Sequence, residues 1–558
     1  MAEAEYTYLF LRPDEGGGIN RPGDIEVGAQ YLFLDLGDFA AAAGLSSLAA
    51  ATRLSGPVAS PISLVPSFVP DILHGSPFEK RPGLTRGNAL PWMPAAALLL
   101  VAAGPGWSAE TWPSFRGPGG SGVAPGGDLP VHFGPETGVV WKADVPPGGS
   151  SPCIWESALF LTAFNDGKLE TLCFDRATGA VRWRRSVEPG TIERGSRLGT
   201  PCDSTPCTDG RRLYVYFAPF GLVCYDFEGA EVWRHPLPTP ITQHGAATSP
   251  VVSGDRVVLA CDQDVGSFLL AVGASDGKPI WRTERPGYRR GFSTPLLVPP
   301  EKPEIVVLTG TLRLASYALA DGSERWVVWG LPNEMVSTPV FGEGLIFAAG
   351  WTHGAGVSRL PKYEELLARG DQDGDGRLRR AEAPDGPARQ HFLYIDADKD
   401  DVLTREEWDS MAAIFERSKN AALAVRPGGR GDVTATHVAW EQTRGLPYVP
   451  TPLYYEGRLY LVKNGGMLSC FEARTGKALF QEERLGALGD YYASPVAAGG
   501  KVCVVSQPGV AVVLKAGDAL EILARNRLGE QVLATPAIVG GTLYVRTQKR
   551  LYAFREGG

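Results

Sequence analysis

From about residue 110 onward, apolar residues occur in short runs of strand length, separated by polar turns that contain glycine. In one representative unit, this pattern predicts strands that begin at Val251, span 257–260 and 268–272, and end at Trp281. Gly-containing pairs between these runs favour tight hairpins. Four short antiparallel strands joined by such turns are typical of one blade of a β-propeller.

A Ser-Pro or Thr-Pro pair begins each unit and returns eight times. The pairs begin at Ser151, Thr205, Ser249, Thr294, Thr338, Thr451, Ser494 and Thr535. Six intervals are 41–54 residues long and the seventh is 113 residues. A period of about 40 to 45 residues with several strands per unit is typical of propellers. The sequence therefore predicts an all-β, eight-bladed β-propeller, and the long interval predicts an insertion.

The two ends of the repeat array complement each other. The eighth unit runs from Thr535 to Phe554 and stops after its third strand, whereas a turn and a strand around Trp141 precede the first full unit. We expect the strand near Trp141 to complete the eighth blade and close the ring, which removes exposed sheet edges. Large aromatic residues that end the other units, such as Trp183 and Trp233, are expected to fill the wedge between blades.

The long interval contains a twelve-residue acidic loop, 371–382, that matches the calcium loop of an EF-hand. Alternate carboxylates converge on one point as the chain winds round an ion, a glycine permits the sharp bend, and the last Glu supplies two oxygens. The predicted calcium ligands are Asp371, Asp373, Asp375, the carbonyl of Arg377, and Glu382.

A second loop, 396–407, follows after a short gap. Its predicted ligands are Asp396, Asp398, Asp400, the carbonyl of Val402, and Glu407. Asp401 replaces the glycine of the sixth position, and we expect weaker binding because a non-glycine residue must adopt a left-handed conformation there. Helices are predicted over 363–368, 392–395 and 406–422. The loops are close together, which favours a structural role for calcium over a switch.

The domain organisation follows from these patterns. Residues 1–92 carry no repeat, and we interpret them as an extension upstream of the biological start that is largely disordered. Residues 93–109 are similar to a signal peptide, with an apolar run too short to span a bilayer. The propeller is expected over 110–356 and 421–558, with a small α-helical EF-hand insertion over 357–420. This arrangement predicts a periplasmic or secreted protein.

The composition of the chain limits the classes of partner and cofactor that are expected. The net charge of −8 argues against nucleic acid, and outside the N-terminal region no apolar stretch is long enough for a transmembrane helix. Eight cysteines occur without a CxxC or CxxCH motif, which disfavours covalent haem. Cys202 and Cys207 are close enough in a Pro-flanked loop for a disulfide to be one alternative. We expect a monomer.

The units from Asp175 to Trp183 and from Glu472 to Phe480 resemble the PQQ-type propeller repeat. Together with Trp112–Gly122 and Arg290–Pro295, the chain from about 110 to 558 is similar to secreted PQQ-like propeller proteins common in planctomycetes, some with embedded EF-hands. The resemblance is specific for fold and not for function, because one fold hosts many activities. The same repeat occurs in quinoprotein alcohol dehydrogenases and in a cofactor-free lipoprotein scaffold of outer-membrane barrel assembly.

Two functions of different class follow from this resemblance. A non-catalytic scaffold that binds a protein or glycan needs only a rigid ring with binding loops. A PQQ-dependent alcohol dehydrogenase implies an adjacent Cys-Cys pair, which this chain lacks, so PQQ is not favoured. A hydrolase or lyase that uses the channel loops is a third alternative. Candidate ligand-binding residues on those loops are His244, Asp262, Asp264, Arg289 and Arg290.

Overall fold

The computed structural model describes residues 7–10, 26–29, 110–192, 199–242, 245–358 and 360–557. The chain divides into two compact units, Met1–Leu98 and Leu99–Gly558. In the first unit, β1 (Thr7–Phe10) pairs antiparallel with β2 (Glu26–Ala29). The remainder of the predicted N-terminal extension and the signal-peptide-like segment 93–109 lie outside the described residues.

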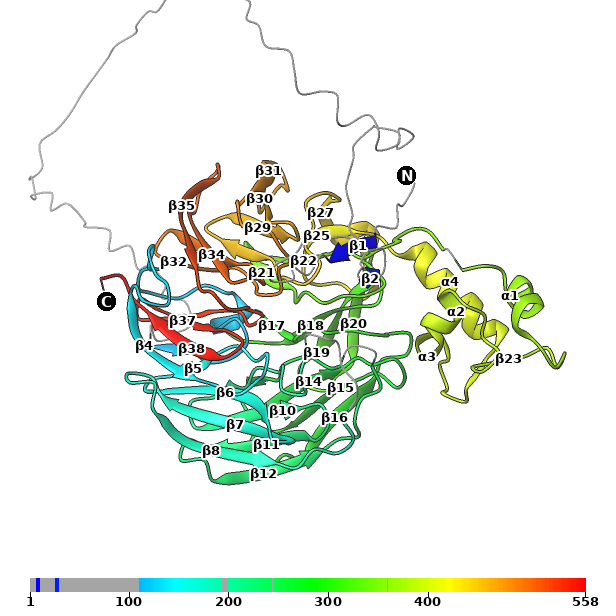
Figure 1. Ribbon diagram of the computed structural model, residues 1–558, viewed down its shortest axis with the longest axis horizontal. Helices are drawn as coiled ribbons and strands as arrows, with labels where there is room; N and C mark the ends of the chain where they lie inside the picture. Colours follow the sequence, from blue (N-terminus) through cyan, green and yellow to red (C-terminus); the bar gives the residue numbers. More distant parts are fainter. Residues whose placement is uncertain are drawn as a thin grey trace, which may run out of the picture. The chain divides into compact units, whose positions relative to one another are not determined.

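Eight antiparallel sheets follow one another around a ring in the second unit, which confirms the predicted eight-bladed propeller (Figure 1). The first four sheets comprise β3 (Thr111–Trp112), β5 (Cys153–Trp155), β6 (Ala158–Asn165), β7 (Lys168–Asp175) and β8 (Val181–Val187); β9 (Cys207–Thr208), β10 (Arg212–Phe217), β11 (Gly221–Asp226) and β12 (Glu231–Pro236); β13 (Val251–Ser253), β14 (Arg256–Cys261), β15 (Phe268–Gly273) and β16 (Pro279–Glu284); β17 (Leu296–Val298), β18 (Ile305–Gly310), β19 (Arg313–Ala318), β20 (Glu324–Trp329) and the added parallel β26 (Gly431–Asp432).

The last four sheets comprise β21 (Val340–Gly342), β22 (Leu345–Gly350), β25 (Ala421–Val425) and β27 (Val438–Gln442); β28 (Leu453–Tyr455), β29 (Arg458–Lys463), β30 (Met467–Glu472) and β31 (Ala478–Arg484); β32 (Val496–Ala498), β33 (Lys501–Val505), β34 (Val510–Lys515) and β35 (Glu521–Arg527); β36 (Ala537–Val539), β37 (Thr542–Arg546), β38 (Arg550–Phe554) and β4 (Val139–Asp144). In the last sheet, Ala553 of β38 pairs with Trp141 of β4, so the N-terminal strand completes the sheet formed by the C-terminus.

One hydrogen bond repeats at every seam of the ring. The backbone N–H of each Ser or Thr in the eight Ser/Thr-Pro pairs donates to the side-chain hydroxyl of the pair in the next sheet, at 2.9–3.2 Å. The bond from the Thr535 N–H to Ser151 Oγ closes the circle. All eight side chains are buried. Because buried backbone donors need partners, this hydroxyl ring fixes each sheet to its neighbour.

Tryptophan docking forms a second contact between neighbouring sheets. At five seams an indole N–H donates at 2.7–3.1 Å to a backbone carbonyl of the next sheet. Each of these indoles lies against a turn glycine, where a Cβ would come within 2.4–2.8 Å of the ring. The Trp–Gly pairs are Trp141–Gly179, Trp183–Gly229, Trp233–Gly277, Trp281–Gly322 and Trp440–Gly476. The recurring glycine is therefore required by close approach as well as by its positive φ.

The ring has two faces that differ in their connections. On the loop face, the outer strand of each sheet leads to the inner strand of the next, and the second strand leads to the third. On the turn face lie the tight turns between the first and second and between the third and fourth strands. The insertion joins β22 to β25, so it leaves from the loop face.

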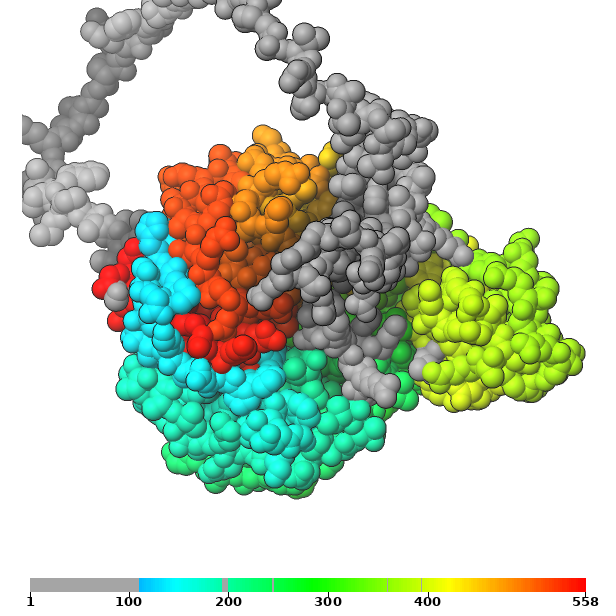
Figure 2. All heavy atoms as spheres, in the orientation of Figure 1, coloured from blue at the N-terminus to red at the C-terminus, as the bar shows by residue number. Residues whose placement is uncertain are grey.

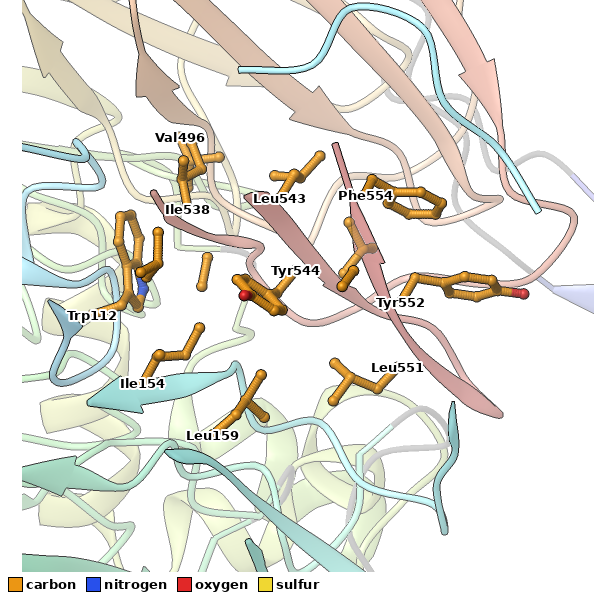
Figure 3. Packing of buried hydrophobic residues seen from close by; sticks show 14 of the residues in the cluster. Trp112, Ile154, Leu159, Val496, Ile538, Leu543, Tyr544, Leu551, Tyr552 and Phe554 are labelled. Carbon is orange, nitrogen blue, oxygen red and sulfur yellow. The ribbon is translucent and has the colours of Figure 1, made fainter. Parts of the chain in front are cut away.

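A plug segment, Trp112–Ala124, covers part of the channel at the turn face. Its Arg116 is fully buried and donates to the carbonyls of Pro452, at 2.8 Å, and Pro495, at 3.2 Å. Burial lowers the pKa of the Arg116 guanidinium to about 9. Figure 3 shows Trp112 packed beside Ile154 and Ile538, at the junction of the first and eighth sheets.

The cysteines are structural, and one sequence alternative is wrong. All eight cysteines are free and buried, so Cys202 and Cys207 do not form a disulfide. The Cys202 thiol donates to the carbonyl of Ala163 at 3.0 Å and packs between the first two sheets, whereas Cys207 belongs to the next hydrophobic cluster. Burial raises the pKa of both thiols, which makes them poor nucleophiles.

The hydroxyl ring predicts that Thr451→Val is destabilising although valine has nearly the same shape. The substitution leaves the buried N–H of Thr338 without its acceptor, which costs about 1–3 kcal/mol of unfolding free energy. The measurement is denaturant unfolding of the variant beside Thr443→Val. Thr443 is exposed, and its substitution is expected to stay within about 0.5 kcal/mol of the parent. Equal effects of the two variants would contradict a stabilising role for the ring.

Candidate metal loops and the polar cluster of the loop face

The insertion is a helical module with its own core. It contains α1 (Tyr363–Gly370), β23 (Leu378–Arg379), α2 (Pro387–Gln390), α3 (Phe392–Ile395), β24 (Val402–Leu403) and α4 (Arg405–Arg417). Buried side chains of these elements form one cluster that includes Phe392 and Trp408, and Figure 2 shows the insertion as a single lobe in yellow-green. The predicted helix 406–422 is too long. It ends at Arg417 because Ala421–Val425 pairs with β22 as the third strand of the fifth sheet.

The first acidic loop brings its carboxylates together. Ligand oxygens of Asp371, Asp373 and Asp375 lie within 4.8 Å of one another. Asp371 accepts from the N–H groups of Gly374, at 2.8 Å, and Gly376, at 2.9 Å, which winds the chain around the carboxylates. Glu382, the twelfth residue, accepts at 3.1 Å from the N–H of the ninth residue.

Arg379, the ninth residue of this loop, lies against the candidate ligands. Its guanidinium contacts Asp373 at 2.9 Å and Asp375 at 2.6 Å. The hydrogen bond from Arg379 to Asp375 lowers the pKa of the Asp375 carboxyl. A cation that enters the loop would have to displace the guanidinium, a competitor that the spacing of the carboxylates does not reveal. Arg377, whose carbonyl is the remaining predicted ligand, donates its N–H to Asp375.

The second acidic loop repeats this geometry with non-glycine residues. Oxygens of Asp396, Asp398 and Asp400 again lie within 4.8 Å of one another. The N–H groups of Lys399 and Asp401 donate to Asp396 at 2.7 and 3.2 Å, as the two glycines do in the first loop. Burial raises the pKa of the Asp396 carboxyl.

Backbone strain distinguishes the two loops. Lys399 and Asp401 have φ values of 63° and 61°, where the first loop has Gly374 and Gly376 at 74° and 76°. A left-handed conformation costs an L-residue about 1–2 kcal/mol, less for Asp. The strain therefore lies in the second loop, which is also the loop predicted to bind calcium more weakly.

The two loops are paired through a short antiparallel ladder. Leu378 of β23 lies opposite Leu403 of β24, and both are the eighth residue of their loop. Val402, a predicted carbonyl ligand, is the neighbour of Leu403 in β24 and pairs with Arg379. Glu407 accepts from the N–H groups of Ala397 and Thr404, so the end of the second loop is tied to its beginning.

Tyr394, in α3, joins the insertion to the propeller just before the second loop. The Arg290 guanidinium stacks on the Tyr394 ring at 3.3 Å from its centre, and Arg289 donates to the Tyr394 carbonyl at 2.6 Å. Arg290 is buried and pairs with buried Asp264 at 3.1 Å. Three of the predicted ligand-binding residues, Asp264, Arg289 and Arg290, therefore meet at this contact.

Asp262 belongs to a second buried ion pair on the same face. Arg285 contacts both of its carboxylate oxygens, at 2.7 and 2.8 Å, and both side chains are almost fully buried. The Arg285 guanidinium stacks on Tyr288 at 3.6 Å and also donates to the Tyr317 hydroxyl. Sequence reasoning missed Arg285, because only the fold brings it opposite Asp262.

The cluster continues across the loop face to an aromatic corner. Burial raises the pKa of the Glu334 carboxyl, the Arg290 charge opposes that shift and the Asp264 charge adds to it. Burial raises the pKa of the Tyr448 hydroxyl. Its ring meets Trp351 edge to face at 6.1 Å.

A pocket of about 310 Å³ borders the same contact. It is lined by Asp264, Arg285, Tyr288, Arg289 and Ala397, among others, so propeller loops and the second acidic loop share it. A pocket of about 290 Å³ lies at the turn face beside the plug, with Phe115 and Trp155 in its wall. The remaining predicted ligand-binding residue, His244, lies outside the described residues.

The family described as "Outer membrane protein assembly factor BamB" matches residues 136–386 and 432–557 of this chain. The chain belongs to this family. The match covers more than half of the sequence and includes strands of all eight sheets, and it leaves out 387–431, which contains the second acidic loop and β25. No curated protein sequence matches the chain.

A solved structure supports the propeller fold. A europium-containing methanol dehydrogenase is similar over 80% of this chain and 98% of its own, with a TM-score of 0.52 and 10% identity. BamB from Moraxella catarrhalis is similar over 75% of this chain and 97% of its own, with a TM-score of 0.49 and 12% identity. Quinohemoprotein alcohol dehydrogenase from Comamonas testosteroni is similar over 80% of this chain and 81% of its own, with a TM-score of 0.49 and 12% identity. At these identities the likeness concerns the propeller fold alone.

The residues do not fit the quinone site that the dehydrogenases of this fold imply. No two cysteines are adjacent in the chain. Arg285 and Arg290, buried cations of the loop face, are already paired with Asp262 and Asp264. Among the described residues, no helix has the length and apolar character needed to cross a membrane.

The buried pair predicts that Asp262→Asn is strongly destabilising. Loss of the carboxylate leaves Arg285 charged and fully buried, which costs about 3–5 kcal/mol. The matched control is Asp385→Asn, which breaks an exposed pair with Arg389 of similar length and should change stability by less than about 1 kcal/mol. Denaturant unfolding compares the two variants, and a small, equal loss in both would show that the buried pair is not required.

Proposed function

We propose that this protein is an extracytoplasmic binding scaffold whose inserted EF-hand pair holds calcium. The observation that carries the scaffold proposal is that the buried charges Asp262 and Arg285, and Asp264 and Arg290, pair with one another and hold the loops of the loop face together. A partner binds on the loop face in this proposal, where loops from several sheets and the insertion meet.

Calcium is the ion that suits the two loops. Each presents three aspartates and a glutamate at the spacing of an EF-hand, all hard oxygen donors. The ion would neutralise carboxylates that otherwise repel one another, and it would hold α3 and α4 at a fixed angle. Since Tyr394 lies two residues before Asp396, calcium in the second loop would stabilise the contact of the insertion with Arg290.

The extracytoplasmic assignment rests on three supports. Family membership, the signal-peptide-like pattern of 93–109 and the calcium loops agree with one another. Extracellular calcium modules bind at about 10⁻⁴–10⁻³ M, an affinity that would be useful only where calcium is abundant.

Calcium is expected to stabilise the protein in proportion to the number of intact loops. With about 10 mM calcium and dissociation constants of about 10⁻⁴–10⁻³ M, each loop contributes about 1.4–2.7 kcal/mol. Glu382→Gln and Glu407→Gln should each abolish one site in calorimetric titration. Glu406→Gln is the matched control, because Glu406 is the exposed neighbour of Glu407 on α4. Unchanged calcium binding in both Glu382 and Glu407 variants would refute the proposal.

Relief of backbone strain should tighten the second site. Asp401→Gly replaces a residue at φ 61° and is expected to increase the calcium affinity of that loop about two- to fivefold, which corresponds to about 0.5–1 kcal/mol. Glu407→Gln in the same background assigns the change to the second loop. A weaker second site in Asp401→Gly would show that the side chain itself contributes to binding.

One titration distinguishes the scaffold proposal from the dehydrogenase alternative. PQQ added to the calcium-loaded protein is expected to give no binding heat. One-to-one binding at about micromolar affinity would overturn the scaffold proposal and favour a divergent quinoprotein.

A further inference from the structure

The pocket of about 290 Å³ at the turn face lies between the plug and the inner strands of the ring. Inner strands of four successive sheets line it, through Trp155 of β5, Thr208 of β9, Val252 of β13 and Leu297 of β17. These strands are far apart in the sequence, so the pocket exists only when the ring is assembled. Its volume is close to the lower end of the range of about 300–1,000 Å³ for ligand sites, which suits a small molecule.

The plug bridges this pocket because it is held at both sides of the opening. The carbonyl of Pro113 accepts from the N–H of Thr208 at 2.9 Å, which fixes the start of the plug to β9. Farther along, Gly119 lies against Pro300, since a Cβ at Gly119 would come 3.2 Å from the Pro300 Cβ. Phe115 lies between these two anchors, is half-buried and lines the pocket. The plug thus adds an aromatic side chain to the wall.

The turn between β9 and β10 brings a carboxylate to the second aromatic side chain of the wall. Gly210 packs so closely on the Trp155 indole that a Cβ would overlap the ring. Asp209, the residue before this glycine, lines the pocket together with Trp155. Its Oδ1 accepts from two backbone N–H groups of its own turn and its Oδ2 from the Tyr214 hydroxyl, each at 2.8 Å. These donors are uncharged, and a carboxylate has about four acceptor sites, so Asp209 can accept from a further donor.

The charge of this carboxylate is not balanced by a cation in the wall. Among the described residues that line the pocket, Asp209 alone is ionisable. Arg211 and Arg212, which follow in the same turn, are not part of the wall. Arg116 of the plug is directed elsewhere, because its guanidinium donates to the carbonyls of Pro452 and Pro495 at the sixth and seventh sheets. The pocket therefore has one negative charge in a largely apolar and aromatic wall.

We propose that this pocket binds a small organic cation, an amine with an apolar body. The ammonium group pairs with Asp209, and the ring faces of Trp155 and Phe115 attract the same positive charge. The apolar body packs on Val252 and Leu297. An alkylammonium group resembles that of lysine and stays charged at neutral pH.

Other classes of ligand suit the pocket less well. An anion would be repelled by Asp209, and a neutral apolar molecule would leave that carboxylate without a charged partner. The site lies at the turn face, whereas the partner surface of the proposed scaffold and the calcium loops lie at the loop face and in the insertion. The two proposals are therefore independent.

The test uses the full chain with calcium present, and phenethylamine and benzyltrimethylammonium as cationic probes in calorimetric titration. At least one probe is expected to bind with a dissociation constant of about 1 mM or tighter. Phenethyl alcohol and hydrocinnamate carry the same ring with a neutral and an anionic head group. Both are expected to bind at least about tenfold more weakly than the better cationic probe.

Two variants assign the binding to the pocket. Asp209→Asn removes the charge but keeps a residue that accepts hydrogen bonds in turns, and it should weaken binding of the cation about tenfold or more. Phe115→Leu removes one ring face and should weaken binding about two- to fivefold. Asp255→Asn is the matched control, because Asp255 lies in the corresponding turn of the next sheet, is 76% exposed and does not line the pocket. Thermal unfolding of each variant checks that the ring remains folded.

Four outcomes would overturn the proposal. The first is no binding of either cationic probe while calcium still binds, which would leave the scaffold and calcium proposals standing. The second is equal affinity for phenethyl alcohol, which would show that charge is not recognised. The third is cation binding that neither Asp209→Asn nor Phe115→Leu weakens, which would place the ligand elsewhere. The fourth is tighter binding of Nα-acetyl-lysine methylamide than of both probes, which would assign the pocket to a lysine side chain of a partner protein.

Discussion

The hydroxyl ring is the constraint on which the rest of the structure depends. Eight backbone N–H groups at the inner strands each donate to a hydroxyl of the next sheet, and the circle closes between Thr535 and Ser151. Proline follows every donor and has no N–H of its own, so the pair presents a single donor to the seam. The bond between Thr338 and Thr451 spans 113 residues and is 3.1 Å long, so the insertion leaves the ring intact.

This rigid ring allows the loops to carry other features. Inner strands fixed by hydrogen bonds, and outer strands fixed by tryptophan docking, hold the loop-face connections in place. The insertion contacts the propeller at more than one point: Tyr394 lies under Arg290, and Arg417 of α4 lies over the Trp329 ring at 4.4 Å. The second acidic loop begins two residues after Tyr394, so the candidate metal site lies beside this contact.

Local pattern was sufficient for some parts of the molecule and insufficient for others. The strand pattern of the unit 251–281, the number of blades and the acidic spacing of both loops could be predicted, because each depends on neighbours in sequence. The end of α4 could not, because Ala421–Val425 has helix-compatible residues and becomes a strand only through its pairing with β22. The disulfide alternative failed for a similar reason, since Cys202 and Cys207 pack into different seams.

The sequence by itself determined the repeat, the eightfold ring and the presence of two loops with calcium-type donors, because these follow from periodicity and from residue types at fixed spacing. Tertiary structure alone decided that the Ser/Thr hydroxyls bond from sheet to sheet, that Arg285 lies opposite Asp262, that Arg379 competes for the first loop, and that the Tyr394 ring lies under Arg290. Those facts concern groups that the chain brings together from distant positions, and no local pattern encodes the distance between them.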